Sequence, residues 1–566
     1  MSTEEGWVTT ENEEKKSLKQ SVYSRSGYCA ETGIYHSLLH LSENHQIPTH
    51  PELDTASFVL SQFPHPDIAE SRIALIDSTT NYKVTYAELR RSIKSLAAGL
   101  HHALGIQKGD VVFLLSANSV QYPIICLAVL SIGAILTTAN PLNTSSEIQK
   151  QVLDSKANLA ISAPEEVHKI LPTGVPTMFT TRSSDQSFLS VEEMIEGGDP
   201  LEAPKIQFLQ TDTAAILYSS GTTGVSKGVV LTHKNLISIM VLLKWTVEAT
   251  SSQDDVYLCF LPMFHIYGLA FFGLGLFCSG TTIVVMRKFD FQSMLDAIKT
   301  HQVNNIPAVP PVILGLVKYT SNGDLSSLRR VSSGAAPLSK EVSDKFREKY
   351  PWVEIRQGYG LTETSGGTSF FIGDEQAKAH AGSSGQLVPT FCAKVIDVES
   401  GVMMPPYGQG ELCVKSPTVM NEYLGNDEAT KVTIDSEGWL HTGDLCYFDQ
   451  DGFLYIVDRI KELIKHNGYQ VAPAELEALL LSHPNILDAA VIPFEDEDAG
   501  EIPMAYVVRS TDSRLTENQV IQFIADQVAP YKKVRKVGFI DVIPRSAAGK
   551  ILRKQLVTQT QLVSKL

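Results

Sequence analysis

Short apolar segments alternate with amphipathic ones along much of this sequence. Residues 73–77, 111–116, 159–162 and 214–220 are rich in Val, Ile and Leu and have the length of buried strands. Residues 86–104 have the spacing of a helix instead. Strands that alternate with helices predict an α/β chain with largely parallel sheets. A chain of 566 residues is also long enough for more than one domain.

Net charge and cysteine usage exclude several classes of protein. Lys and Arg total 47 against 63 Asp and Glu, so the formal net charge is −16. We therefore expect no nucleic-acid partner, because coating nucleic acid requires the opposite balance. The seven cysteines are odd in number and form no C-x-x-C pair, which argues against a disulfide framework or a cysteine zinc site. A reducing compartment is expected.

The two ends of the chain and its most apolar stretch bear on targeting. Residues 1–20 are polar, so we expect a disordered tail and no secretory leader. Residues 260–278 are the most apolar, but Pro262 and His265 interrupt them, which favours buried core and predicts no transmembrane segment. The last residues, 564–566, read S-K-L and predict import into the peroxisome by its receptor; a chance match is the alternative.

A loop suited to binding an anion follows the strand expected at 214–220. Its glycines let backbone N–H groups converge on a polyphosphate, and its hydroxyl and ammonium groups add donors. The expected phosphate-binding residues are Ser219, Ser220, Gly221, Thr222, Thr223, Gly224 and Lys227. The loop is not a Walker A motif, because Ser226 precedes Lys227 and Gly228 follows it. A surface turn is the alternative.

Residues 219–228 resemble the phosphate loop of the adenylate-forming superfamily, which includes acyl-CoA synthetases, luciferases and peptide-synthetase adenylation domains. Motifs of that superfamily recur in order at 357–363, 439–444, 458–462, 468–475 and 549–554. Residues 262–269, 333–338 and the S-K-L end are similar to plant peroxisomal 4-coumarate–CoA ligase-like proteins, including OPC-8:0 CoA ligase-like members. The resemblance implies an α/β fold with a large AMP-binding domain of mixed and parallel sheets and helices at 21–458, and a small mobile α+β domain at 459–561.

The resemblance implies an acyl-CoA ligase. Such enzymes form an acyl-adenylate from ATP and a carboxylic acid, release pyrophosphate, and then transfer the acyl group to the thiol of coenzyme A. Charge that develops on the phosphates calls for cationic groups and a metal, so ATP, Mg²⁺ and coenzyme A are the expected cofactors. A luciferase-like oxidoreductase, an adenylation enzyme that serves a carrier protein and a non-catalytic scaffold are the alternatives.

By this resemblance, one set of residues would hold the nucleotide and its metal. The nucleotide-binding residues would be Gln357, Gly358, Tyr359, Thr362, Asp444, Arg459 and Lys461. Tyr359 would stack on adenine, Thr362 would contact the α-phosphate, and Asp444 would accept the ribose hydroxyls. Glu363 would bind Mg²⁺, which prefers oxygen ligands. The structural alternatives are a core position for Tyr359, a helix start at Glu363 and a turn at Asp444.

Two residues would serve the adenylation step. Lys550 lies in a loop of small residues and would bridge the carboxylate and the α-phosphate, which makes it the predicted catalytic residue. His265 would flank the bound carboxylate and gate its pocket. A lone histidine in an apolar stretch can equally be a core residue.

For the second step, the resemblance implies that the small domain turns about a hinge at 458–461. Gly468 would then line the pantetheine tunnel, Gln470 would contact the adenylate, and Lys288 would meet a phosphate of coenzyme A. Many relatives carry a lysine where this chain has Asn467, and Lys465 is a candidate replacement.

Substrate choice would lie in an apolar pocket. Its implied residues are Ile266, Tyr267, Phe271, Gly334, Ala335, Gly366 and Gly367. Residues 364–367 read Thr-Ser-Gly-Gly, where relatives that prefer hydroxycinnamates carry Ala-Gly-Pro-Val. The smaller wall argues against a strict 4-coumarate ligase and permits medium or long fatty acids or jasmonate precursors of the OPC type. Phenylpropanoid acids remain open.

Overall fold

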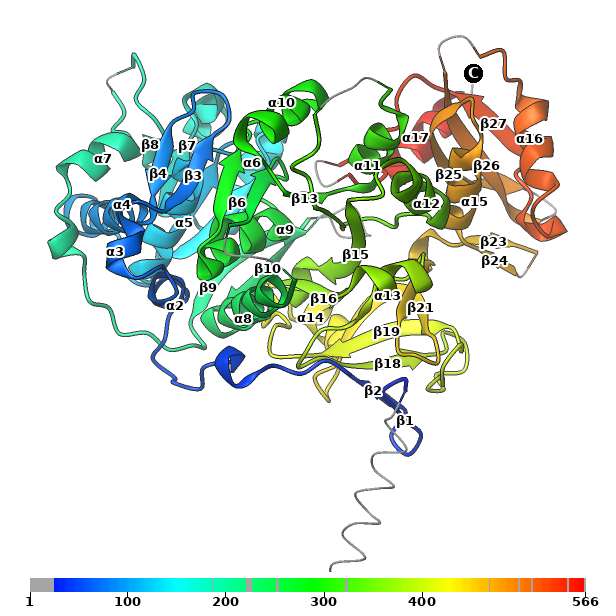
Figure 1. Ribbon diagram of the computed structural model, residues 1–566, viewed down its shortest axis with the longest axis horizontal. Coiled ribbons are helices and arrows are strands. Elements are labelled where there is room, and N and C mark those ends of the chain that lie inside the picture. The colour runs from blue at the N-terminus through cyan, green and yellow to red at the C-terminus, as the bar shows by residue number, and fades with distance from the viewer. Residues whose placement is uncertain are drawn as a thin grey trace, which may run out of the picture.

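The computed structural model describes residues 25–185, 187–219, 226–250, 254–320, 324–467, 469–496, 499–510, 513–546 and 549–563. Within these ranges the chain forms four β-sheets, three of them before residue 460 and one after it. Figure 1 shows the last sheet with its helices, orange to red, at one end of the molecule. The predicted N-terminal tail and the S-K-L tripeptide lie outside the described residues.

Two large sheets have parallel centres. The nine-stranded sheet has the order β17 (Gln386–Leu387), β16 (Gly366–Phe370), β15 (Glu354–Leu361), β14 (Arg330–Ser333), β13 (Asn305–Ala308), β11 (Val256–Cys259), β12 (Thr282–Val285), β3 (Ile73–Asp77) and β4 (Lys83–Thr85). The seven-stranded sheet has the order β20 (Glu422–Tyr423), β10 (Lys227–Thr232), β9 (Thr213–Ser219), β6 (Ile135–Ala139), β5 (Val111–Leu115), β7 (Leu159–Ser162) and β8 (Thr177–Phe179). The four strands expected from the sequence are β3, β5, β7 and β9, all at parallel positions.

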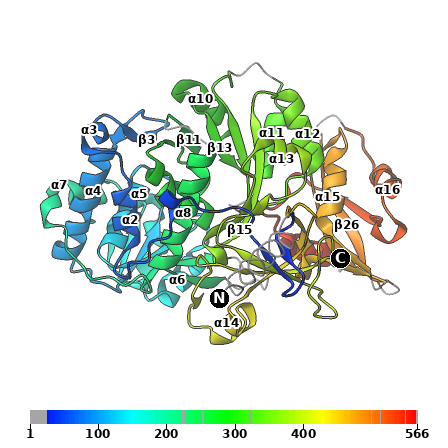
Figure 2. The ribbon, with the colours of Figure 1, turned by 60° about the horizontal axis from the view of Figure 1, so that its bottom comes forward.

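The other two sheets are largely antiparallel, which agrees with the expected mixture of sheets in the large part and the expected α+β small part. An antiparallel sheet joins β1 (Tyr28–Cys29), β2 (Ile34–His36), β18 (Cys392–Ile396), β19 (Gly410–Lys415), β21 (Leu440–Phe448) and β22 (Leu454–Arg459). The last sheet contains β24 (Tyr469–Val471), β23 (Ile464–His466), β26 (Gly500–Arg509), β25 (Ile486–Asp496) and β27 (Lys536–Phe539), and only β26 and β27 pair in parallel. Figure 2 shows the dark blue N-terminal strands beside the yellow strands of the third sheet.

Helices cover these sheets. They are α2 (Thr55–Ser61), α3 (Pro66–Ala69), α4 (Tyr86–Ala98), α5 (Gln121–Ser131), α6 (Ser145–Asp154), α7 (Val191–Gly197), α8 (His233–Thr250), α9 (Ile266–Gly268), α10 (Phe291–His301), α11 (Pro310–Lys318), α12 (Lys340–Lys349), α13 (Asp374–Ala379), α14 (Asp427–Thr433), α15 (Pro473–Ser482), α16 (Glu517–Ala525) and α17 (Arg553–Val563). The expected helix at 86–104 is α4, which starts at a capping box of Thr85 and Glu88 and continues as a π-helical turn, Gly99–Ala103.

The apolar stretch at 260–278 is short helical turns inside the large core, as expected. None of the helices in the described ranges combines the length and apolar character of a membrane span. The seven cysteines all lie in the described ranges and carry thiols that are not joined in disulfides, as the sequence predicts.

Two large apolar cores, with smaller clusters beside them, organise the described chain. One core extends from Tyr35 to Leu454 through the first three sheets, and another packs the last sheet against α15 and α16. These cores confirm the expected α/β fold with a large N-terminal part and a smaller C-terminal part. The predicted boundary after residue 458 falls near the end of β22.

Candidate active site

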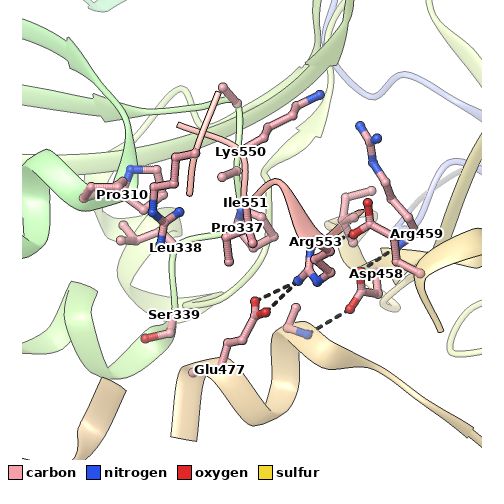
Figure 3. Close-up of a pocket in the computed structure, with 18 of the residues that line it drawn as sticks. Pro310, Pro337, Leu338, Ser339, Asp458, Arg459, Glu477, Lys550, Ile551 and Arg553 are labelled. Carbon is pink, nitrogen blue, oxygen red and sulfur yellow. Dashed lines mark hydrogen bonds and ion pairs between the residues drawn. The ribbon is translucent and has the colours of Figure 1, made fainter. Parts of the chain in front are cut away.

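A cavity of about 1810 Å³ opens between the large and small parts of the molecule. Residues from β15, β21, β22 and the loop before α17 line it, so distant segments of the sequence meet there (Figure 3). The sequence-predicted residues among its walls are Ala335, Gln357, Gly358, Tyr359, Asp444, Arg459, Lys461 and Lys550. The structure thus gathers most of the predicted nucleotide-binding set and the predicted catalytic lysine in one place.

Asp444 is buried and held from two sides. The Tyr359 hydroxyl donates to Asp444 Oδ2 at 2.6 Å, and Arg459 Nε lies 3.7 Å from Oδ1. Burial raises the pKa of the Asp444 carboxyl, and the charge of Arg459 opposes that shift. The pairing of β21 with β22 explains the contact, because Asp444 stands opposite Arg459 in the register. A carboxylate and an aromatic ring therefore form one wall of the cavity.

Lys550 reaches this wall from the small part of the molecule. Burial and the charge of Arg459 lower the pKa of its ammonium to about 8, while the charges of Asp444 and Glu363 act in the opposite direction. Figure 3 shows Lys550 and Arg459 extending on the same side of the cavity, away from Glu477. His265 is near enough to be affected: burial, aided by the charge of Lys550, lowers its pKa to about 4. His265 is therefore neutral at pH 7.

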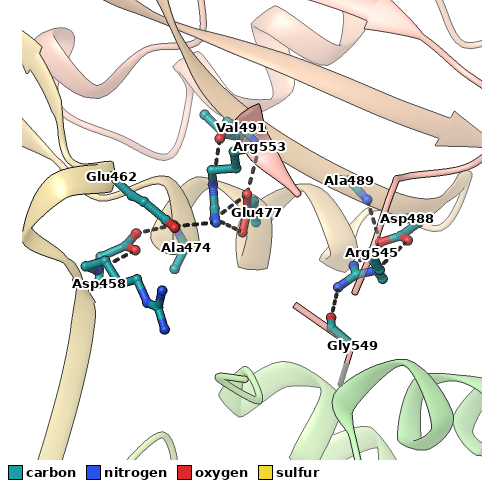
Figure 4. A network of polar contacts seen from close by, with 11 residues as sticks. Asp458, Glu462, Ala474, Glu477, Asp488, Ala489, Val491, Arg545, Gly549 and Arg553 are labelled. Carbon is teal, nitrogen blue, oxygen red and sulfur yellow. Dashed lines mark hydrogen bonds and ion pairs between the residues drawn. The ribbon is translucent and has the colours of Figure 1, made fainter. Parts of the chain in front are cut away.

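The loop that carries Lys550 is tied down on both sides (Figure 4). Before it, Arg545 pairs with Asp488 at 2.8 Å and donates to the Gly549 carbonyl oxygen at 2.9 Å. After it, Arg553 pairs with Glu462 at 2.6 Å and with Glu477 at 2.8 Å.

The same network reaches the segment predicted to be the hinge. Glu462 follows that segment directly, and the Asp458 carboxylate accepts the backbone N–H of Ala474 at 2.8 Å. Arg553 therefore connects the Lys550 loop to the segment predicted to be the hinge and to α15. The sequence motif contains Arg553 but does not indicate its partners, which lie 76 and 91 residues away.

Glu363 and Lys227 both contact Tyr423, a residue outside the set predicted from the sequence. Glu363 Oε1 accepts hydrogen bonds from the Ser219 hydroxyl at 3.2 Å and from the Tyr423 hydroxyl at 2.9 Å. Lys227 Nζ stands 4.5 Å from the centroid of the Tyr423 ring. The predicted metal ligand and phosphate lysine are thus neighbours. Ser220 to Gly224, also predicted to bind phosphate, lie outside the described residues.

A second group of residues supports the part of β21 that precedes Asp444. Glu411 Oε1 accepts the backbone N–H of Gly443 at 3.0 Å, and Oε2 lies 2.9 Å from His441 Nδ1. Cys413 Sγ is 3.4 Å from the same nitrogen. These three side chains are close enough to suggest a metal site. Both Glu411 oxygens already make hydrogen bonds within the protein, however, so we interpret Glu411 as a brace that positions Asp444.

The predicted acid-pocket residues pack closely. The Tyr267 ring lies against Gly334, where an added Cβ would stand 3.0 Å from Tyr267 Cε1. Tyr267 and Phe271 meet edge to face, with centroids 6.0 Å apart. Gly366 has φ +134°, which favours glycine, and nothing lies within 4 Å of an added Cβ at Gly367.

Of the predicted acid-pocket residues, Ala335 lines the large cavity, whereas Tyr267, Phe271 and Gly334 do not. Ile266 is buried, and Thr362 is buried at the end of β15. Arg459 and Lys461 line the cavity from the end of β22 and the turn after it.

Residues predicted for the second step lie elsewhere. Gln470 is exposed and lines a separate cavity of about 350 Å³, with Asp397 and Tyr531 among its neighbours. Lys465 and Lys288 are also exposed, and neither lines the large cavity. The β23–β24 hairpin projects from the small part of the molecule (Figure 1). Gly468 lies outside the described residues.

Comparison with known proteins identifies the family. The family model described as "AMP-binding enzyme" matches residues 67–424. The family model described as "AMP-binding enzyme C-terminal domain" matches residues 475–550. The chain therefore belongs to the AMP-binding enzyme family. Within it the chain is an acyl-CoA ligase, an acid–thiol ligase related to plant 4-coumarate–CoA ligase-like proteins, as the motifs predict.

Relatives match nearly the full chain. "Probable CoA ligase CCL5" of Humulus lupulus is 48% identical and covers 96% of this chain and 98% of its own length. "Peroxisomal OPC-8:0-CoA ligase 1" of Arabidopsis thaliana is 45% identical, and the match covers 96% of this chain and 100% of that relative. Among solved structures, ATP-bound MatB from Rhodopseudomonas palustris has a TM-score of 0.79 at 27% identity and covers 90% of this chain and 99% of its own.

Proposed function

We propose that this acyl-CoA ligase activates a medium or long aliphatic acid, or an oxylipin acid of the jasmonate-precursor type, in preference to 4-coumarate. We propose ATP, Mg²⁺ and coenzyme A as its co-reactants. The observation that supports adenylation at this site is the convergence of Lys550 with Asp444, Tyr359 and Arg459 in one cavity.

Adenylation fits the charges in this cavity. Asp444 would accept the ribose hydroxyls, while the adjacent Tyr359 ring would stack on adenine. The Lys550 ammonium would lie between the acid carboxylate and the α-phosphate, where it offsets repulsion between two anions. Neutral His265 would flank the carboxylate without adding charge. Gln357 and Gly358 would border the base, and Thr362 would contact the α-phosphate.

Glu363 is suited to hold the metal. Its Oε1 atom accepts two hydrogen bonds, and no hydrogen bond within the described residues reaches Oε2. A carboxylate oxygen is a ligand that Mg²⁺ prefers, and the bound ion would neutralise charge on the triphosphate. Lys227 would add a second positive charge at the phosphates, next to the hydroxyl of Ser219.

The second step requires a different arrangement of the same chain. We propose that residues 459–561 turn as a small domain about 458–461, so that the β23–β24 hairpin reaches the cavity. Gln470 would then contact the adenylate, Gly468 would line the path of the thiol arm, and Lys465 and Lys288 would meet phosphates of coenzyme A. The exposure of Gln470 and Lys465 supports this proposal, because neither is committed to the core.

The preference for an aliphatic or oxylipin acid rests on the pocket wall. Two glycines at 366 and 367 leave space that Pro and Val would fill, and nothing lies within 4 Å of an added Cβ at Gly367. A relative named for OPC-8:0 is 45% identical, which supports the oxylipin option. Ala335 and Phe271 would set the width of the pocket, and Ile266 its floor.

We also propose that the protein is imported into the peroxisome through its S-K-L end. A relative named as peroxisomal supports this location. Fluorescent fusions with a free or a masked C-terminus would test it; diffuse fluorescence of the free-end fusion would refute it.

The activity is tested by incubating the purified protein with ATP, Mg²⁺, coenzyme A and a mixed acid library, followed by mass spectrometry. We expect acyl-CoA products, AMP and pyrophosphate, with aliphatic or oxylipin acids ahead of 4-coumarate. Light or CO₂ release without coenzyme A would indicate a luciferase-like enzyme instead. Coumarate turned over far faster than every other acid would reverse the substrate proposal.

A further inference from the structure

Tyr423 contacts two parts of the proposed site at once. Its hydroxyl donates to Glu363 Oε1 at 2.9 Å, and its ring faces Lys227 Nζ at 4.5 Å from the centroid. The side chain is 6% exposed, so solvent competes little with either contact. No motif of the sequence analysis includes this residue.

The backbone around Tyr423 fixes its position. Strand β20 pairs with β10, which begins at Lys227, and Val229 stands opposite Tyr423. Leu424 N–H donates to the Gly228 carbonyl oxygen at 2.7 Å, and Met420 N–H donates to the Glu363 carbonyl oxygen at 2.8 Å. One short strand thereby joins the segment that carries the phosphate lysine to the segment that carries the metal ligand.

We propose that Tyr423 is a positioning residue that orients the Glu363 carboxylate toward Mg²⁺ and holds the Lys227 ammonium toward the phosphates of ATP. This inference rests on the proposed function, in which Glu363 binds the metal. A hydrogen bond to Oε1 limits rotation of the carboxylate and leaves Oε2 for the ion. A ring beneath an ammonium stabilises the cation without forming a salt bridge that a phosphate would have to break.

The two contacts can be separated by substitution. Tyr423→Phe removes the hydroxyl and keeps the ring, whereas Tyr423→Leu removes both. Tyr35→Phe is the matched control, because the Tyr35 hydroxyl is also buried but donates to the Met404 carbonyl oxygen in another sheet. Glu363→Gln tests the proposed metal ligand itself.

Metal affinity is measured by titrating Mn²⁺ with electron paramagnetic resonance, in the presence of a non-hydrolysable ATP analogue. We expect Tyr423→Phe to weaken Mn²⁺ binding about tenfold, as the loss of one hydrogen bond to a charged group predicts. Tyr35→Phe should stay within about twofold of the unmodified protein. Glu363→Gln should weaken binding more than Tyr423→Phe.

Nucleotide affinity without metal is measured by calorimetry with the same analogue in EDTA. We expect Tyr423→Leu to weaken binding about fivefold, and Tyr423→Phe to leave it within about twofold, since the ring remains. Equal affinities for the Phe and Leu variants would overturn the role toward Lys227.

The outcomes separate this inference from the function on which it rests. If Glu363→Gln weakens Mn²⁺ binding and Tyr423→Phe matches Tyr35→Phe, the role of Tyr423 toward Glu363 is wrong while the metal site stands. If Glu363→Gln has no effect, the proposed metal ligand is wrong, and this inference falls with it. Tyr423→Phe keeps the packing of the ring and should fold. Its Mn²⁺ affinity therefore tests the role toward Glu363 even if Tyr423→Leu fails to fold.

Discussion

The small C-terminal part of the molecule presents two regions that differ in environment. The Lys550 loop faces the large cavity and is held by Arg545 and Arg553, whereas Gln470, on the β23–β24 hairpin, is exposed and lines a separate, smaller cavity. One rigid unit cannot place both regions at the same nucleotide together. The contrast favours the observed arrangement for adenylation and supports the proposal that the unit turns before thioester formation.

The largest expected effect comes from removing the ammonium in the cavity. Lys550→Ala should slow acyl-adenylate formation by about 10²–10³-fold, as expected for one group that stabilises transition-state charge. Conversion of a supplied acyl-adenylate to the thioester should change less than about threefold. Single-turnover assays of each half-reaction provide the measurement.

A lysine outside the cavity is the control for this change. Lys533 lies in the small C-terminal part, as Lys550 does, but it does not line the cavity. Lys533→Ala should therefore leave both half-reactions unchanged. Equal losses of the two half-reactions in Lys550→Ala would contradict the division of labour.

The exposed hairpin should show the opposite pattern. Gln470→Ala should slow transfer of the acyl group to coenzyme A by about tenfold or more, through loss of a contact to the adenylate. Adenylate formation, measured as the release of pyrophosphate, should remain near normal. A loss confined to adenylation would mean that the hairpin does not act in the second step.

The pH dependence of adenylation should follow the Lys550 ammonium. Its pKa of about 8 means that the charged form predominates at pH 7 and becomes a minority by pH 9. We expect kcat/KM for adenylation to fall about tenfold between pH 7 and pH 9, since the charged form is the active one. Lys550→Arg keeps its charge over this range and should flatten the profile; a profile as steep as that of the unmodified protein would exclude Lys550 as the titrating group.

The smallest effect concerns a contact between the two parts of the molecule. Lys318 Nζ, at the end of α11, donates to the carbonyl oxygens of Ile486 and Leu487, at 3.3 and 2.9 Å. Lys318→Met keeps the stem but removes the donor, so the adenylation arrangement should be less populated. We expect adenylation to slow about threefold and transfer to coenzyme A to be equal or faster. Slower transfer with normal adenylation would show that this contact does not favour the observed arrangement.

The features predicted best from the sequence are those that depend on residues close together in the chain. Strands β3 and β7 have the predicted bounds, because runs of Val, Ile and Leu bury both faces in a parallel sheet. The strand pairing of the antiparallel third sheet was not predicted, because its strands come from segments far apart, such as β2 and β18. Roles assigned to Gln470, Lys465 and Lys288 remain predictions.

What the sequence determined by itself is the set of reactive groups and their family: a glycine-rich loop, the carboxylate of the motif at 439–444, and a lysine in a loop of small residues. Only the tertiary structure decided which groups meet. Tyr423 reaches Glu363 across 60 positions, and Arg553 reaches Glu462 across 91. The physical reason is that residue type and spacing determine local backbone and charge, whereas long-range contacts depend on strand register and on how two separate cores are placed against each other.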